Sequence, residues 1–439
     1  MSDHPMMPDS NLQAFYLDCG SGNGLYYMGH ASVLAIFSGK RILFDPVVLS
    51  KPYGDSWVFF PPQIVDASVF EVDVVVVSHI HQDHYDVEYL KAIDGKAKIV
   101  VIGGRPSFIA ELMSQGLKSL MVVEPETLVE ILDGVSIFGV LHETNGIDSS
   151  AIVFNDDFCI YHGNDNYLQP EALKKFTSVG KKIQIACIPY AYIHWYPFLM
   201  EYGPDQGDFK EIEGRRLVEM YMDDCIASVG ILQPEVMIPF GANLLLDDGD
   251  VYSAINTAVN TPIEFCEYAA RKMPHLAKII RPMLAGDYCI LQNEELQVVI
   301  REKLDGDAYR AQAGKFLELR PVKTPNSEWV SIDKNSFIES LQNKVAQMKD
   351  FLEDVIRIDM VYLGENLKVE IDCLRHDARW VDEFTEAVKY HHFKLDPIAS
   401  GYWLNGGRFE EVVGMRRFTL ERVPDVYSKD VLRVAGTVI

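Results

Sequence analysis

The segment VVVVSHIHQDHYD, residues 74–86, constrains the fold of this chain more than any other. Three histidines and an aspartate fall within six residues, in a chain of 439 residues that has only 12 histidines. The apolar run before them, Val72 to Val77, shows no polar alternation, which is typical of a strand covered on both faces. The sequence therefore predicts a buried sheet with a polar cluster at the end of one strand.

The spacing H-x-H-x-D-H in this segment indicates a metal site. Side chains two positions apart in an extended chain point to the same side, so His79 and His81 can hold one ion. If the chain then turns into a helix, Asp83 and His84 are directed at a second ion nearby. Imidazole and carboxylate bind borderline cations, and two such ions can share a bridging hydroxide. We therefore predict a dinuclear site.

Two ions need further ligands, and polar residues that follow later strands supply candidates. His142 comes directly after the strand-like run VSIFGVL, and Asp165 lies just past another run, in YHGNDNY. A carboxylate between two cations can bridge them, so Asp165 is the predicted bridge. Asn164 and Asp157 are the local alternatives to Asp165, and Glu143 and His162 are reserve ligands, with His162 expected beside the site.

Short strand-like runs alternate with helices, which predicts an α/β layer architecture with sheets inside and helices outside. The long helix 208–229 has Gly230 near its end. Strands are predicted at 24–37, 41–44, 72–77, 98–102, 121–123, 128–132, 135–141, 151–155 and 158–162, and helices at 87–93, 107–115, near 170 and at 208–229.

Composition changes at residues 302–330, which are polar and contain turn-forming residues. We place a boundary there, with a metal-binding catalytic domain at 1–302 and a C-terminal α+β accessory region at 303–439. In that region we expect helices at 336–355 and 380–391 and strands at 367–371 and 416–422.

The charge balance disfavours nucleic acid and membrane surfaces as partners. Lys and Arg total 40 against 64 Asp and Glu, a net charge of −24 that repels phosphates and anionic lipid. No run approaches the ~20 apolar residues of a membrane helix, and the N-terminus does not resemble a secretory signal. The seven cysteines are scattered without a C-x-x-C pair, so we predict a cytoplasmic protein with buried, non-ligating thiols.

Together with the histidine motif, the stretch GHASVLAIFSGKRILFDP resembles the opening strands of the metallo-β-lactamase superfamily. The resemblance implies an αββα sandwich with metals at one edge of the two sheets, and His30 and Asp45 close to them. Hydrolytic members carry a last histidine after a late strand. The matching place here, VMIPFGANLLL, has Pro239 and Phe240 instead, which disfavours an ordinary two-zinc hydrolase.

A narrower resemblance extends from about residue 24 to 427. The chain is similar to the non-Rieske part of CMP-N-acetylneuraminate hydroxylases in SHIHQDHYDVEYLKAI, in IDSSAIVF after His142, and in NDN at 164–166. The similarity continues in LQPEVMIPFGANLLL, ARKMPHLAKIIRPMLAGDY and RFTLERVPDVY. That family is an iron oxygenase fed by a Rieske cluster, which needs two Cys-x-His pairs. This chain has no such pair, so the electrons would come from a separate protein.

Candidates for contact with the substrate lie outside the metal motif. Arg281 and Arg105 are candidate partners of an anionic group. His194, in the aromatic segment YAYIHWYPFLMEYG, would be a ligand in place of the missing histidine, a proton shuttle or part of a pocket wall. Tyr196 and its aromatic neighbours would shape the pocket.

Two functions follow from these residues. The first is a non-haem iron oxygenase, with two irons or one, that hydroxylates a small metabolite, whether anionic or neutral, with Asp83 and His194 as catalytic residues. The second is a hydrolase of an ester, lactone or phosphodiester, with zinc or manganese and a metal-bridging hydroxide. A third alternative, a metal-binding protein without activity, is disfavoured because the motif is intact.

The C-terminal region would cap the pocket, form a homo-oligomer or dock a reductase. In the oxygenase, one iron is held by His79, His81 and His142, and the other by Asp83, His84 and the bridging Asp165.

Overall fold

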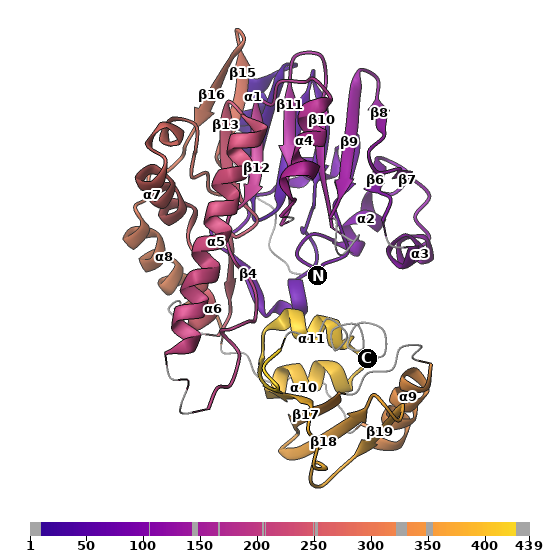
Figure 1. Ribbon diagram of the computed structural model, residues 1–439. Coiled ribbons are helices and arrows are strands. Elements are labelled where there is room, and N and C mark those ends of the chain that lie inside the picture. The colour runs from indigo at the N-terminus through magenta and orange to yellow at the C-terminus, as the bar shows by residue number, and fades with distance from the viewer. Residues whose placement is uncertain are drawn as a thin grey trace.

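The computed structural model describes residues 10–104, 106–142, 148–165, 167–203, 206, 208–248, 250, 253–321, 332–347 and 354–426. Two large β-sheets pack face to face with helices on their outer sides, and a smaller unit lies at one end of this sandwich (Figure 1). The predicted αββα architecture with a smaller α+β unit is therefore confirmed.

The two sheets of the sandwich are mixed, and each has a parallel part. The first sheet is parallel from β3 to β7 and antiparallel elsewhere, and the second is parallel from β11 to β13. The first sheet has the order β16 (Glu295–Val299), β15 (Tyr288–Gln292), β1 (Asn23–Gly29), β2 (Ser32–Phe37), β3 (Lys40–Phe44), β5 (Val74–Val77), β6 (Lys98–Ile102) and β7 (Leu120–Val123). The second has the order β13 (Val236–Phe240), β12 (Ile185–Pro189), β11 (Cys159–His162), β10 (Ser149–Phe154), β9 (Val135–Leu141) and β8 (Leu128–Leu132).

The central strands β1, β2 and β5 of the first sheet are buried on both faces, which explains their apolar runs. In β2, Val33 and Ala35 pack between the two sheets, whereas Leu34 and Ile36 pack under the outer helices. The predicted strand 24–37 is a hairpin in the structure, with a turn at His30 between β1 and β2. Burial on both faces favours β-branched residues, as in the valine run of β5.

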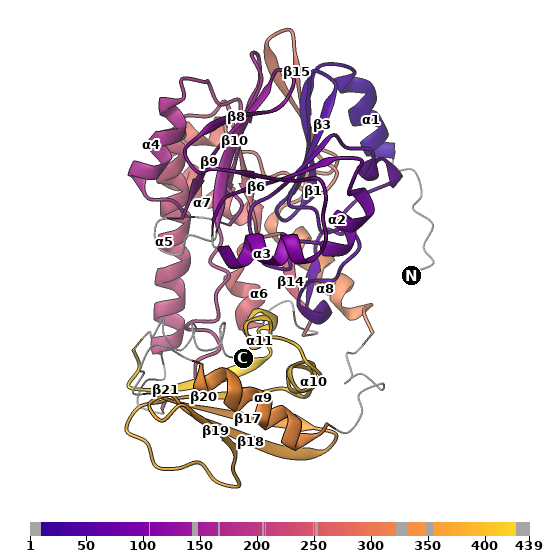
Figure 2. The same ribbon diagram turned by 90° about the vertical axis from the view of Figure 1, so that its right-hand side faces the viewer.

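Helices cover both outer faces of the sandwich (Figure 2). The first sheet is covered by α1 (Ser10–Cys19), α2 (Val87–Ile93) and α3 (Pro106–Ser114). The second is covered by α4 (Pro170–Ser178), α5 (Phe209–Leu232) and α7 (Pro262–Lys272). The pair β4 (Trp57–Phe59) and β14 (Leu244–Leu246), with α6 (Ala254–Ala258) and α8 (Gly306–Glu318), extends the sandwich toward the smaller unit.

The C-terminal unit is a five-stranded sheet with three helices and its own apolar core. Its helices α10 and α11 lie on the side that faces the sandwich (Figure 1). There the indole of Trp57 donates a hydrogen bond to the Gly414 carbonyl at 2.8 Å. The unit comprises β19 (Asp377–Trp380), β18 (Glu365–Asp372), β17 (Val355–Tyr362), β20 (Tyr390–Leu395), β21 (Phe418–Val423), α9 (Lys334–Ala346), α10 (Pro397–Leu404) and α11 (Phe409–Met415).

Two predictions for the C-terminal region are wrong. Residues 380–391 form no helix, because the buried carboxylate of Glu370 accepts hydrogen bonds from the backbone N–H and the hydroxyl of Thr385 and holds that segment as an extended connection. The helix expected to reach Val355 ends at Ala346, and Val355 begins β17. The boundary after residue 302 stays a prediction. The helix that follows it, α8, packs on the sandwich through Tyr309.

None of the helices within the described ranges is long and apolar enough to cross a membrane.

Candidate metal centre

The histidine motif lies at the edge of the sandwich where the parallel strands end. His79 to His84 form the connection between β5 and α2, and Asp45 directly follows the neighbouring strand β3. From the second sheet, Asp165 lies just past β11, and Asp148 directly precedes β10, which pairs with β11. Because the carboxyl ends of parallel strands meet at one edge of a sheet, residues from distant parts of the sequence converge here.

The converging side chains form three overlapping sets, each of two imidazoles and one carboxylate. Within each set, the nitrogen and oxygen atoms that could bind an ion lie within 4.8 Å of one another. The sets are His79, His81 and Asp148; His79, His84 and Asp165; and His30, His84 and Asp83.

Asp165 faces two histidines, one with each of its carboxylate oxygens. Its Oδ1 is 3.7 Å from Nε2 of His79, and its Oδ2 is 3.6 Å from Nε2 of His84. Asp148 Oδ1 is 3.8 Å from Nε2 of His79. This places Asp165 where a carboxylate can bridge two cations.

Asp45 and Ser78 fix the ring orientation of two of these histidines. Asp45 is fully buried, and its Oδ2 accepts hydrogen bonds from Nδ1 of His84 at 2.8 Å and from the Ser78 hydroxyl at 2.6 Å. Since the Ser78 hydroxyl donates to Asp45, its oxygen accepts from Nδ1 of His79 at 2.9 Å. Both histidines therefore carry a proton on Nδ1, and Nε2 of each ring is the atom left for an ion to bind.

The donor atoms of this centre fit divalent metal ions. Nε2 of His84 and Oδ1 of Asp165 are buried, and neither has a hydrogen-bond partner within the described part of the chain. Such atoms cost free energy unless something satisfies them. Burial opposes a charge on His84, but Asp165 and Asp83 outweigh it and raise its pKa well above the usual value. A cation that binds imidazole and carboxylate would satisfy both atoms.

Asp83 is held by two further residues near the centre. His30 lies in the β1–β2 turn with a left-handed φ of 51°, and its Nε2 is 3.2 Å from Oδ2 of Asp83. The hydroxyl of Tyr53 donates to Oδ1 of Asp83 at 3.1 Å. Burial opposes ionisation of Asp83, but His84 and His30 more than offset it, so its pKa lies far below the usual value. Both His30 and Asp45 lie close to the centre, as the resemblance implies.

The structure brings five of the six predicted ligands into these sets. His142, the sixth, lines the same cavity but belongs to none of the three sets, and Asp148 accompanies His79 and His81 instead. No local pattern in the sequence marks Asp148, which stands three residues before the predicted strand 151–155. The predicted ligands brought together are His79, His81, Asp83, His84 and Asp165.

Two residues beside the centre have apolar or backbone partners. Nε2 of His162 donates to the Ala31 carbonyl at 3.0 Å, and its ring stacks on Phe44, so it lies beside the sets as expected. Phe240, at the place of the missing last histidine, is fully buried between the sheets with its ring edge against His162. The position at which the resemblance implies a last histidine in hydrolytic members therefore contributes to the core here.

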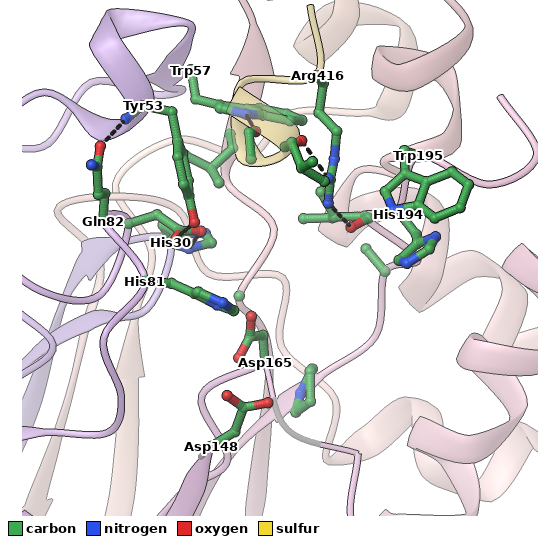
Figure 3. Close-up of a pocket in the computed structure, with 18 of the residues that line it drawn as sticks. His30, Tyr53, Trp57, His81, Gln82, Asp148, Asp165, His194, Trp195 and Arg416 are labelled. Carbon is green, nitrogen blue, oxygen red and sulfur yellow. Dashed lines mark hydrogen bonds and ion pairs between the residues drawn. The ribbon is translucent and has the colours of Figure 1, made fainter. Parts of the chain in front are cut away.

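A cavity of about 530 Å³ opens from the candidate ligands toward the C-terminal unit (Figure 3). The sandwich contributes His30, Tyr53, His81, Asp83, Asp148 and Asp165 to its wall. The C-terminal unit contributes Arg408, Glu410, Glu411, Val413, Gly414 and Arg416. Sequence reasoning missed Tyr53 and this second group, because no local pattern marks a contact between segments more than 300 residues apart.

Of the other predicted site residues, some line the cavity and others do not. His194 is in the cavity wall, where burial and the charge of Arg416 lower its pKa to about 3. Tyr196 is not among the lining residues, and its ring lies under the guanidinium of Arg422, 4.9 Å away. Arg281 also lies outside the lining and donates to the carbonyls of Ala277 and Ile280. Two further candidates, Arg105 and Glu143, lie outside the described residues.

Comparison with known proteins matches this region to a family. A model of the β-lactamase superfamily domain matches residues 24–189. A UPF0173 metal-dependent hydrolase of Pyrococcus abyssi is 31% identical over 172 residues, which are 37% of this chain and 70% of the relative. A putative Rieske 2Fe-2S iron–sulfur protein of Mycolicibacterium smegmatis is 28% identical over 218 residues, 46% of this chain and 41% of the relative.

Among solved structures, the diiron β-hydroxylase CmlA of Streptomyces venezuelae is similar with a TM-score of 0.44 and 14% identity, over 63% of this chain and 54% of CmlA. The first curated relatives are each matched over only 35% to 62% of their own length.

Proposed function

Because this chain belongs to the metallo-β-lactamase superfamily, whose members are metalloenzymes, we propose that it is a non-haem iron oxygenase with a dinuclear site. Its substrate would be a small metabolite, and its electrons would come from a separate protein. The relative in Mycolicibacterium smegmatis is named as a Rieske protein, and this chain contains no Cys-x-His pair of its own.

The observation that carries the proposal is the composition of the three ligand sets. Each set has two histidines and one carboxylate, which is the donor set of non-haem iron oxygenases. Burial of Phe240 where a last histidine would stand adds to this, since it removes a nitrogen ligand typical of zinc hydrolases of this superfamily. When bound, a pair of irons would supply the redox chemistry that activates oxygen.

The residues of the chain would hold and orient the reacting groups. His79, His81 and Asp148 would hold one ion, His84, Asp83 and His30 the other, and Asp165 would lie between them. Asp45 and Ser78 hold a proton on Nδ1 of His84 and His79, so Nε2 of each ring would be the atom that binds an ion. Tyr53 holds Oδ1 of Asp83 through its hydroxyl proton. The C-terminal unit covers the cavity and would keep bulk water from the reacting atoms.

The proposal is tested by the reaction of the loaded protein with oxygen. Protein loaded with iron and reduced chemically without air should change its visible absorption within one turnover after oxygen is added. Protein loaded with zinc serves as the control and should show no change. An iron-loaded, reduced protein that consumes no oxygen and keeps its spectrum would contradict the oxygenase.

A second candidate is a metal-dependent hydrolase of an ester, lactone or phosphodiester with zinc or manganese. The observation that favours it is the relative in Pyrococcus abyssi, which is named as a metal-dependent hydrolase and is matched over 70% of its length. In that case Asp83 would orient the attacking hydroxide. Turnover of such substrates by zinc- or manganese-loaded protein, with no oxygen-dependent signal from the iron form, would favour this alternative.

A further inference from the structure

The cavity wall holds two arginines that differ in their partners. Arg408 pairs with Glu411 at 3.0 Å and with Glu111 at 3.3 Å. Arg416 has no carboxylate within 4.0 Å of its guanidinium among the described residues. It donates only to backbone carbonyls, from Nη1 to Val413 at 2.7 Å and from Nη2 to Ile193 at 3.4 Å. Its Nε is buried without a hydrogen-bond partner in the described part of the chain.

Among the described residues, Arg416 lacks the acidic partner that its neighbour in the sequence has. The chain has 64 acidic against 40 basic residues, and the next arginine along, Arg417, pairs with Asp396 at 3.0 Å. A buried cation costs free energy unless an anion or several hydrogen bonds compensate it. Arg416 keeps part of its donor capacity unused at the wall of this cavity.

The position of Arg416 suits contact with a ligand in the cavity. The residue ends α11 in a left-handed conformation with φ of 56°. In Figure 3 its side chain extends toward the cavity between Tyr53 and His194, across from Asp148 and Asp165. A molecule in the cavity can therefore touch Arg416 at one end while its other end faces the candidate metal ligands.

Six tyrosine and tryptophan side chains contribute to the cavity wall. The rings of Tyr192 and Tyr221 meet edge to face with centroids 4.7 Å apart, and the ring of Tyr167 is 4.2 Å from that of Tyr221. Aromatic walls favour flat, apolar groups. The aromatic lining residues are Tyr53, Trp57, Tyr167, Tyr192, Trp195 and Tyr221.

We propose that Arg416 binds the carboxylate of a small organic acid with a flat, apolar body, and that this acid is the class of substrate that the metal centre acts on. The inference rests on the proposed metalloenzyme function and adds the substrate class to it. The planar guanidinium matches a carboxylate through parallel N–H donors, which a lysine cannot reproduce. A cavity of about 530 Å³ has the size of small-molecule sites.

Calorimetric titration of the metal-replete, full-length protein with benzoate and with benzamide tests this proposal. The two probes have the same ring, and only benzoate carries a charge. Wild type should bind benzoate at least about 10-fold more tightly than benzamide, and Arg416→Gln should remove most of that difference. For Arg416→Lys the difference in affinity between benzoate and benzamide should lie between the values for wild type and Arg416→Gln. Lysine keeps the positive charge but lacks the parallel N–H donors of the guanidinium. The control Arg215→Gln, at an exposed position on α5, should bind as wild type does.

Equal binding of benzoate and benzamide by wild type would overturn the proposal. Undiminished benzoate binding by Arg416→Gln would also overturn it, because the metals alone would then hold the carboxylate. Circular dichroism and metal content of each variant show whether it is folded and loaded. If Arg416→Gln does not fold, the Arg416→Lys titration decides by itself. No step of this test uses oxygen, so failure of the oxygenase and failure of the carboxylate site give different results.

Discussion

Asp45 and Ser78 hold two of the candidate ligands without facing the cavity themselves. Asp45 accepts from His84 and from Ser78, and Ser78 in turn accepts from His79. A carboxylate that can only accept hydrogen bonds determines which nitrogen of each ring is protonated. The ligand geometry of this centre therefore depends on a residue that need not touch an ion.

Replacement of Asp45 by asparagine should lower metal affinity by about 10- to 100-fold, the usual effect of losing a partner behind a ligand. The amide can donate to Nδ1 of His84, which would move the ring proton to Nε2. Competition with a chelator measures the affinity. Asp66→Asn is the control, because Asp66 is buried and accepts hydrogen bonds at a turn remote from the centre. Equal affinity of Asp45→Asn and wild type would contradict the assigned role.

His391 should make the C-terminal unit sensitive to acid. Burial, with the nearby charge of Arg422, lowers its pKa to about 4, against about 6.5 in an unfolded chain. Between these values the unfolded chain binds one more proton than the folded chain. The free energy of unfolding therefore falls by up to about 1.4 kcal/mol for each pH unit below 6.5.

The prediction is checked by urea unfolding of wild type and His391→Gln at pH 7.5 and pH 5.0. From pH 7.5 to pH 5.0, the free energy of unfolding of wild type should fall by about 2 kcal/mol more than that of the variant. An equal loss in both proteins would show that His391 does not contribute.

At the level of single residues, the sequence predicted the candidate ligands of one motif and Asp165, and it missed other residues that reach the cavity through distant contacts. His79, His81, Asp83 and His84 are neighbours in the chain, so their spacing carried the information. Asp148, Tyr53 and Arg416 reach the same cavity from separate segments, and no local pattern distinguishes them from surface residues.

Among the elements, α11 packs closely against the segment that carries Tyr53. A Cβ atom added to Gly414 would lie 2.3 Å from the ring of Tyr53. Gln82, inside the histidine motif, donates to Glu411 of the same helix at 2.7 Å. The metal-binding segment and the C-terminal unit are therefore in direct contact.

Two helical glycines give a matched test of this contact. Gly414→Ala should reduce the free energy of unfolding by about 1–3 kcal/mol, because the new methyl group must displace Tyr53. Gly230→Ala should raise it by about 0.5–1 kcal/mol, since nothing lies within 4 Å of the added atom and alanine favours a helix. Chemical denaturation measures both. A stabilising effect at both positions would contradict the close packing of α11.

Helices and strands were predictable where the apolar pattern of the sequence matches the burial of the side chains in the structure. The valine run of β5 and the helix α2 have the expected bounds to within two residues. The segment 380–391 has apolar residues at helical spacing, but hydrogen bonds of Thr385 to Glu370 determine its conformation, and Glu370 is a residue of another strand. Tertiary contacts of this kind override local propensity.

At the scale of the whole molecule, the sandwich supplies the candidate ligands and the C-terminal unit closes the cavity over them. The order of strands and helices sufficed to predict the sandwich, because each apolar run needs a covering layer. The position of the C-terminal unit over the cavity was one of three alternatives, and the sequence carried no signal to choose among them. Through Arg416, the C-terminal unit would take part in binding the substrate carboxylate.

The most direct test of this account is the metal content of wild type and of His81→Ala, each purified without air and without added metal. We expect roughly two irons per chain in wild type, because the ligand sets suit iron. His81→Ala should lose most of this metal while its circular dichroism spectrum stays that of the folded protein. Wild type free of metal, or a His81→Ala variant that keeps its full metal content, would contradict the assignment of this centre.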